Sequence, residues 1–276
     1  MEFNEDARAW LRANVANHVP NGTRQYFTNV ITTNIGVNSL GLQVDRPAFE
    51  GKVIHSEPGV FGVVKTGRNR FVLVDAAVLA ADLEVGSKVH VTPYQRRRFD
   101  GKSFLEPIEE KTQAGGVMVK TYHIGDRVSE IPLPAPQCEY LQAMQDLLHR
   151  GNCTDGIRVI SNMLVDFNAK NLAWQQAGKS AEGELLDPQF RFDCETSKFT
   201  GHVRIGLDRS EDAYYVEMHK IGMQGEHELV NSCKSVFFVD LAEVLETLLC
   251  DGQWKLCKVT VLKAAKSPAA QEEKTS

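Results

Sequence analysis

The sequence predicts an α+β protein with two domains: a small β-barrel-like domain, then a mixed α/β domain with an antiparallel sheet and about three helices. Between residues 51 and 94, short runs of β-branched and aromatic residues alternate with turn signals about every eight to twelve residues, which is typical of small barrels. Residues 131–136 read Ile-Pro-Leu-Pro-Ala-Pro, a composition that favours a stiff connector. Beyond it, apolar residues recur at helical spacing and then in alternation.

The first domain is expected to span residues 1–111. A helix is predicted over 4–19, because Asn4 can cap it, acidic residues fill its first turn and Pro20 ends it. Residues 26–44, rich in Asn, Thr and Gly, are expected to form irregular strands with turns. Strands follow as far as Tyr94, and the next basic residues are expected at a hairpin tip beside Asp100-Gly101.

A linker is expected over residues 112–136, and a second domain over residues 137–263. Its predicted helices cover 137–150, a segment capped by Thr154 or Asp155, and 241–249. Its predicted strands are 190–194, 202–207, 213–218, 236–239 and 254–262. The polar tail, residues 264–276, is expected to be disordered.

Composition restricts the class of protein. The chain has 276 residues, 42% of them hydrophobic, and a formal net charge of -5, values that are ordinary for a folded globular protein. No apolar run approaches the roughly 18 residues that cross a bilayer, and the first residues lack the basic and apolar segments of a secretion signal. We therefore expect a cytoplasmic protein without membrane contact, whose six cysteines are free thiols.

The basic residues are concentrated in one region. Residues 51–104 hold nine lysines and arginines against five acidic residues, a net charge of +4, which leaves -9 for the rest of the chain. Such segregation is the electrostatic signature of a phosphate-contacting face. The predicted nucleic-acid-binding residues are Lys65, Arg68, Arg70, Arg96, Arg97 and Arg98. Phe61, Tyr94 and Phe99 lie near them in the sequence, and aromatic side chains beside arginine suit single-stranded nucleic acid.

No catalytic residue, metal site or cofactor is predicted. His219 and His227, with the glutamates around them, form one arrangement that could gather a divalent metal. The carboxylates of the Asp208–Asp212 segment form another candidate for acid–base or metal chemistry. Both segments are also typical of solvated turns, which is the reading we favour.

One stretch of the sequence resembles a known family. The Gly-Arg turn at Gly67-Arg68, the later Leu79 and the strand Val85-Gly86-Ser87-Lys88-Val89-His90-Val91 resemble the KfrB domain over residues 51–94. That family occurs on accessory proteins of conjugative plasmids, and the resemblance implies an origin on a plasmid or another mobile element. Val74-Asp75 stands where the family usually has a histidine.

The expected function is a non-enzymatic accessory protein of a mobile element that binds DNA or RNA through basic turns. One alternative is a protein-interaction module, or an inhibitor of a host enzyme, that acts through the acidic remainder of the chain. The other alternative is a metal-dependent enzyme. The partner and the oligomeric state do not follow from the sequence.

Overall fold

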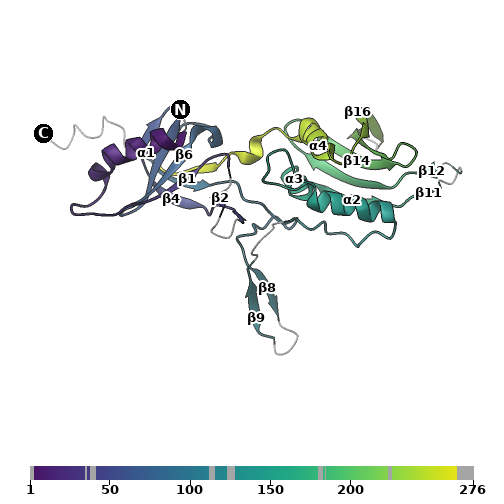
Figure 1. Ribbon diagram of the computed structural model, residues 1–276, viewed down its shortest axis with the longest axis horizontal. Helices are drawn as coiled ribbons and strands as arrows, with labels where there is room; N and C mark the ends of the chain where they lie inside the picture. Colours follow the sequence, from purple (N-terminus) through teal and green to yellow (C-terminus); the bar gives the residue numbers. More distant parts are fainter. Residues whose placement is uncertain are drawn as a thin grey trace. The chain divides into compact units, whose positions relative to one another are not determined.

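The computed structural model describes residues 3–34, 36–37, 42–111, 116–122, 128–179, 183, 185–222 and 226–265. The protein is α+β and forms two compact units (Figure 1). Unit 1 comprises Met1–Gln95 and Trp254–Ser276, and unit 2 comprises Arg96–Gln253. This division differs from the expected domains 1–111 and 137–263, because the C-terminal segment returns to the first unit.

Unit 1 is built on a six-stranded sheet in the order β1-β6-β5-β4-β7-β17. The strands are β1 (Phe27–Ile31), β4 (Phe49–Glu57), β5 (Phe61–Gly67), β6 (Arg70–Asp75), β7 (Lys88–Thr92) and β17 (Lys258–Lys263). The pair β1–β6 is parallel and the other four pairs are antiparallel. Because β1 and β17 are the two edges and do not pair with each other, the sheet is open and the expectation of a barrel is wrong.

Each face of this sheet has its own core. On one face, helix α1 (Phe3–Asn14) and the 3-10 helix η1 (Val15–His18) cover Phe61, Val63, Phe71 and Leu73. Trp10 of α1 stacks on His55 of β4 with ring centroids 4.2 Å apart. On the other face, alternate residues of the same strands pack under the 3-10 helix η2 (Ala76–Val78) and the segment after it. The helix expected over 4–19 is therefore present, with its last turn wound as 3-10 helix.

The last strand was expected in the second domain and belongs to unit 1. β17 pairs antiparallel with β7. Two contacts fix the segment that leads into β17. The Cys257 amide donates to the Val78 carbonyl at 2.8 Å, and the Trp254 ring packs edge-on against the Tyr94 ring with centroids 4.7 Å apart. Local alternation marks a strand but does not say which sheet it joins.

Unit 2 is a five-stranded antiparallel sheet in the order β10-β13-β14-β15-β16, with helices packed on one face. The strands are β10 (Lys170–Gln175), β13 (Gln189–Glu195), β14 (Thr200–Asp208), β15 (Ala213–Ile221) and β16 (His227–Val236). The helices are α2 (Glu139–Arg150), α3 (Ile160–Asp166) and α4 (Leu241–Leu249). Their buried residues, such as Leu141, Met163 and Leu245, pack against Phe190, Val203 and Val216.

Three segments of unit 2 differ from what the sequence predicted: one helix, one strand and the linker. The second helix begins at Ile160, because Asp155 Oδ1 instead accepts from the amides of Ile157 and Arg158 at 2.7 and 2.9 Å and closes a turn. The strand expected at 236–239 ends at Val236, and the next three residues form an exposed turn. The linker expected over 112–136 contains strand β9 (Met118–Thr121).

Three short strand pairs and one 3-10 helix are also present among the described residues. They are β2 (Gly36–Val37) with β3 (Gln43–Val44), β8 (Ile108–Lys111) with β9 (Met118–Thr121), β11 (Gly178–Lys179) with β12 (Leu185–Leu186), and the 3-10 helix η3 (Gln253–Lys255) before β17. Of the tail expected to be disordered, residues 266–276 lie outside the described residues.

A candidate anion-binding row of lysines

Four lysines stand in one row across unit 1. Lys65 of β5 is directly opposite Lys52 of β4, Lys52 is opposite Lys88 of β7, and Lys88 is opposite Lys263 of β17. We call these four residues the lysine row. Since neighbouring strands are about 4.8 Å apart, the row spans roughly 14 Å. Directly opposite residues share a face of a sheet, so four ammonium groups project to the same side, which is the side that α1 covers further along β5.

The backbone beneath the row depends on two glycines. A Cβ on Gly51 would stand 2.3 Å from the Lys65 carbonyl oxygen, so only glycine lets β4 approach β5 this closely. Gly86 adopts a φ of +93° just before β7, and its amide donates to the Val53 carbonyl at 2.9 Å. These close approaches bring Lys52, Lys65 and Lys88 together.

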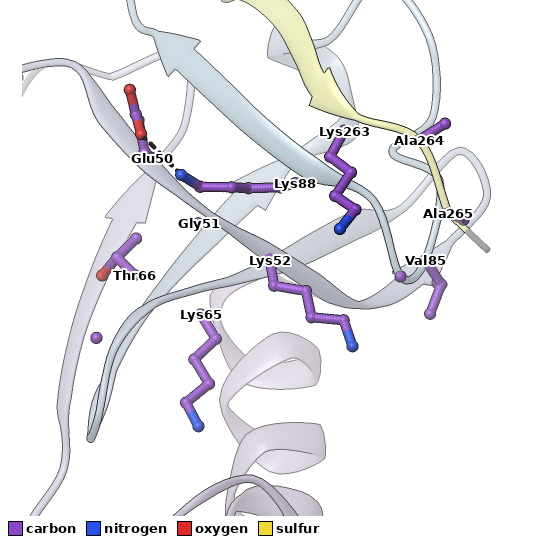
Figure 2. A pocket seen from close by; sticks show the side chains of 12 residues that line it. Glu50, Gly51, Lys52, Lys65, Thr66, Val85, Lys88, Lys263, Ala264 and Ala265 are labelled. Carbon is purple, nitrogen blue, oxygen red and sulfur yellow. Dashed lines mark hydrogen bonds and ion pairs between the residues drawn. The ribbon is translucent and has the colours of Figure 1, made fainter.

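The lysine row lines a pocket of about 840 Å³ (Figure 2). Its other lining residues include Glu50, Thr66 and Gly67. Glu50 is the one acidic residue in the lining, and its carboxylate accepts from Lys88 Nζ at 3.2 Å. In the part of the chain that the structure describes, Lys52, Lys65 and Lys263 have no ion pair with a carboxylate. The pocket therefore has an excess of positive charge.

The positive charge of the row affects the pKa of a neighbouring histidine, His18. Lys65 Nζ donates to the His18 carbonyl at 2.6 Å, which fixes the end of η1 beside the row. Burial lowers the pKa of His18, and the charges of Lys65 and Lys52 lower it further. On the other side of the row, contacts from Lys88 and His90 lower the pKa of Glu50, which stays ionised.

Three of the predicted binding residues lie at this end of the sheet. Lys65 belongs to the lysine row, while Arg68 and Arg70 are exposed at the β5–β6 turn. Gly67, which lines the pocket, pairs with Arg70. The structure therefore places these three cations at the same end of the sheet as the lysine row, with Arg70 on the opposite face.

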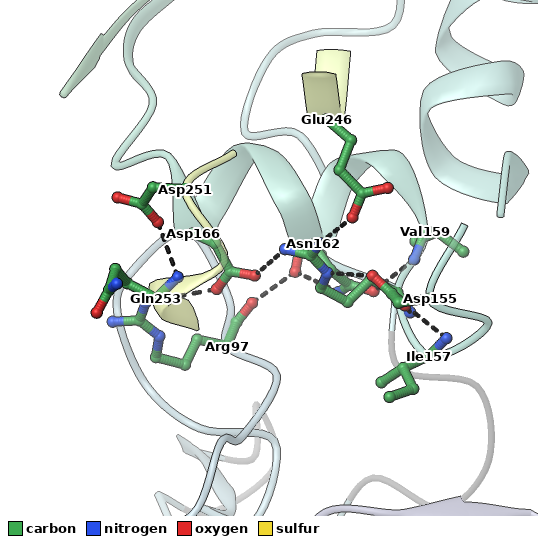
Figure 3. A network of polar contacts seen from close by, with 11 residues as sticks. Arg97, Asp155, Ile157, Val159, Asn162, Asp166, Glu246, Asp251 and Gln253 are labelled. Carbon is green, nitrogen blue, oxygen red and sulfur yellow. Dashed lines mark hydrogen bonds and ion pairs between the residues drawn. The ribbon is translucent and has the colours of Figure 1, made fainter. Parts of the chain in front are cut away.

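The other three predicted residues lie in unit 2 and have partners there. Arg96 is 5% exposed and donates to the Ile157 carbonyl at 3.4 Å. Arg97 Nη2 lies 3.6 Å from Asp166 Oδ1 (Figure 3). Arg98 Nε lies 3.5 Å from Asp100 Oδ1. The hairpin expected here is present, since Arg97 forms a β-bridge with Ser103. These arginines hold their own unit together, so the single basic face expected from the sequence is divided between two units.

A buried ion network explains why Arg97 has a partner. Arg158 is fully buried and donates to Asp155, Asp166 and Glu246 at 2.8, 2.9 and 2.9 Å (Figure 3). One buried guanidinium thus ties the turn before α3 to α3 and α4. Asp166 accepts from Arg158 and also faces Arg97, and these shared contacts offset the cost of burying its charge. We assign this network to stability.

The aromatic residues singled out from the sequence are engaged in packing. Phe61 is buried in the core under α1. Tyr94 and Phe99 are partly buried, Tyr94 against Trp254 and Phe99 against the core of unit 2. These contacts occupy the rings, so we do not assign them to ligand stacking.

The two candidate sets for metal or acid–base chemistry are accounted for by local contacts. Asp208 Oδ1 accepts from the amide and hydroxyl of Ser210 at 2.8 and 2.6 Å, which closes the β14–β15 turn and lowers the pKa of Asp208. The rings of His219 and His227 are 6.2 Å apart, and His219 Nε2 lies 3.1 Å from Glu217. Among the residues described, no group of three or more His, Cys, Asp and Glu side chains is placed to hold a metal ion.

Of the four lysines in the row, sequence reasoning assigned only Lys65 to the site. Lys52 and Lys88 were counted in the basic region but were not assigned to the site, and Lys263 was placed in the other domain. The available signal was the spacing within strands, since Lys52 and Lys65 lie symmetrically about the β4–β5 turn. No local signal places Lys263 beside them.

Comparison with known proteins adds no relative. No protein-family model, no curated protein and no solved structure matches this chain. Within the described residues, no helix has both the length and the apolar character needed to span a membrane. The site's own geometry therefore carries the functional argument.

Proposed function

We propose that unit 1 binds nucleic acid through backbone phosphates that lie along the lysine row. The observation that supports this most is the register itself, in which four lysines face one another across four adjacent strands. Like charges directly opposite each other destabilise a sheet, so the arrangement has a cost that bound anions would offset.

The shape of the site favours a chain of phosphates over a single anion. The row is roughly 14 Å long, which is several times the size of one phosphate group. Arg68 and Arg70 extend the positive charge past the β5–β6 turn. Lysine binds phosphate as a point charge without fixed geometry, so we expect little sequence preference.

Arg96, Arg97 and Arg98 are left out of the proposed site. Arg96 is buried against the Ile157 carbonyl, and Arg97 faces Asp166. Their contacts are satisfied within unit 2, which differs from the role expected from the sequence.

The proposal predicts a defined salt dependence. If the four lysines of the row each neutralise one phosphate, log K should fall with log salt concentration with a slope of roughly -2.8 for a single strand and roughly -3.6 for duplex DNA. Removing two lysines should halve the slope.

The test is fluorescence anisotropy of a labelled oligonucleotide titrated with the full chain at several salt concentrations. The variant K52Q/K263Q removes two charges from the row. The matched control K170Q/K179Q removes two exposed lysines from unit 2 and changes the net charge equally. We expect the first variant to halve the slope and weaken binding, and the control to resemble the unchanged protein. Equal effects of both variants would contradict the proposal, because net charge alone would then explain binding.

A second function has one observation in its favour. Phe237, Phe238 and Val239, between β16 and α4, are 61%, 64% and 67% exposed. Consecutive exposed apolar residues are typical of surfaces that bind proteins. Such a surface is apolar, whereas the sequence had pointed to an acidic one. Absence of oligonucleotide binding at low salt would favour this protein-interaction module.

The setting in which the protein acts is a separate matter. An accessory role on a plasmid or another mobile element follows from the resemblance of residues 51–94 to the KfrB domain. Nucleic-acid binding through the lysine row does not depend on that resemblance.

A further inference from the structure

Two exposed aromatic residues lie at the same end of the sheet as the lysine row. Phe27, the first residue of β1, is 58% exposed, and Tyr26 just before it is 38% exposed. Large aromatic side chains are usually buried, so two adjacent exposed rings at a strand end are unusual. Neither ring belongs to the cores of unit 1.

The β5–β6 turn holds these rings in place. The Phe27 amide donates to the Asn69 carbonyl at 2.9 Å, and Asn69 Nδ2 donates to the Gln25 carbonyl at 3.0 Å. The Tyr26 ring meets Phe71 edge-on with centroids 6.3 Å apart. The backbone under both aromatics is therefore fixed before any ligand binds, which reduces the entropy lost on binding.

A cation, Arg70, lies beside the ring of Phe27, the more exposed of the two aromatic residues. The guanidinium carbon of Arg70 lies 5.9 Å from the centre of the Phe27 ring, within the range of a cation–π contact. Arginine beside an exposed aromatic ring offers a second planar surface on which a base can stack.

The two rings lie at the same end of the sheet as the lysine row, one on each face. Tyr26 packs on Phe71, which pairs with Lys65, so Tyr26 lies on the face of the row. Phe27 pairs with Arg70, and alternation along β1 and β6 places both side chains on the opposite face, with Ile31 and Val72. Strands β1 and β5 are two strand spacings, about 10 Å, apart, and a flexible strand can pass from the row over the β5–β6 turn to Phe27.

We propose that the ligand of unit 1 is single-stranded nucleic acid, with bases stacked on Phe27 and Tyr26 and phosphates along the lysine row. This inference rests on the proposed function and specifies its ligand. A duplex keeps its bases paired and stacked inside, where these rings do not reach them. A single strand offers both exposed base faces and backbone charge.

The experiment separates the phosphate contribution from the base contribution. The probes are a 12-nucleotide oligo(dT), its RNA counterpart oligo(U), a 12-base-pair DNA duplex, and inorganic polyphosphate, which has the charge but no bases. Binding of the full chain is compared with that of F27L, F27Y and a matched control, F237L, in unit 2. Thermal unfolding of each variant shows that it is folded.

We expect F27L to weaken oligo(dT) and oligo(U) binding by about 5- to 150-fold, the range for loss of one stacked base. It should leave polyphosphate binding and the salt slope unchanged. F27Y should keep the affinity of the unchanged protein, because the ring remains, and F237L should have no effect.

The outcomes distinguish the two proposals. Binding of polyphosphate and oligonucleotides with no loss in F27L, or equally tight binding of the duplex, would overturn the single-strand inference and leave the proposed function standing. No binding of any probe at low salt, polyphosphate included, would overturn the proposed function itself.

Discussion

Lys52 stands directly opposite Lys88 across β4 and β7, and the same lysine stands opposite Lys65 across β4 and β5. Its ammonium group therefore has a like charge on both sides. Glu50 relieves the charge of Lys88 by an ion pair, but it does not reach the centre of the row. The folded state of unit 1 thus carries a repulsion that ligand binding would remove.

Removing the central charge should stabilise the protein. We expect Lys52→Gln to raise the free energy of unfolding by about 0.2–1 kcal/mol in low salt, since it removes two like-charge pairs. Polyphosphate should raise the unfolding temperature of the unchanged protein more than that of the variant. Differential scanning fluorimetry with and without polyphosphate measures both effects, and Lys170→Gln is the control. Destabilisation by Lys52→Gln would show that the lysine stem contributes more by packing than its charge costs.

The pKa of His18 should report on the row. It is lowered from 6.5 by burial first and then by the charges of Lys65 and Lys52. We therefore expect Lys52→Gln, or bound polyphosphate, to raise this pKa toward 6.5. Nuclear magnetic resonance titration of the histidine rings measures it. His149 of unit 2, whose pKa is lowered by burial, should not respond.

The direction of the linked pH effect on stability follows. Because the folded pKa of His18 lies below its unfolded value of 6.5, the unfolded chain binds more protons between the two values. The stability that depends on neutral His18 is therefore fully present above pH 6.5 and is lost as the pH falls through the lower, folded value. The loss should be smaller in Lys52→Gln than in the unchanged protein.

The two arginines that contact Asp166, Arg158 and Arg97, should contribute different amounts to the stability of unit 2. Arg158 is fully buried and pairs with three carboxylates, so Arg158→Met should destabilise unit 2 by about 3–5 kcal/mol. The side chain of Arg97 is 40% exposed and 3.6 Å from Asp166, so Arg97→Gln should cost about 1 kcal/mol or less. Urea unfolding of both variants tests this. A large loss in Arg97→Gln with little change in Arg158→Met would contradict the assignment of the network.

Unit 1 should require its C-terminal strand. We expect residues 1–95 alone to unfold without cooperativity, because β7 loses its outer neighbour and Cys257 leaves the core. The rings of Tyr94 and Trp254 are 4.7 Å apart, so a short Gly/Ser linker can join Gln95 directly to Trp254. That joined fragment should unfold cooperatively, as measured by circular dichroism. Cooperative unfolding of residues 1–95 at the temperature of the joined fragment would show that β17 is dispensable.

Much of the fold follows from local patterns in the sequence. The amphipathic spacing around Trp10 and Leu11 predicts α1, and the runs on either side of the turn at Glu57-Pro58-Gly59 predict β4 and β5. Closure of the sheet was predicted wrongly. Strand pairing between residues far apart, such as Val89 with Val261, is decided by tertiary packing. The local alternation of apolar and polar residues does not reveal it.

The residues of the candidate site could likewise be predicted only in part from local sequence patterns. Lys65 and Arg96 both belong to the basic region of the sequence, and their charge alone does not distinguish them. They differ because Arg96 is buried on the carbonyl of Ile157, which is 61 residues away in the sequence. Lys65 instead acquires lysine neighbours on adjacent strands. Which cations gather at one surface is thus decided by the tertiary fold.

The return of β17 to unit 1 has a consequence for synthesis on the ribosome. Residues 96–253 are made between the two parts of unit 1. At about 5–20 residues per second, this segment takes roughly 8–30 s. During that interval the sheet lacks its outer strand, and Lys263 has not yet been made. A chain that terminates before β17 would therefore have an incomplete row, so the proposed binding by unit 1 would depend on synthesis of residues 254–263.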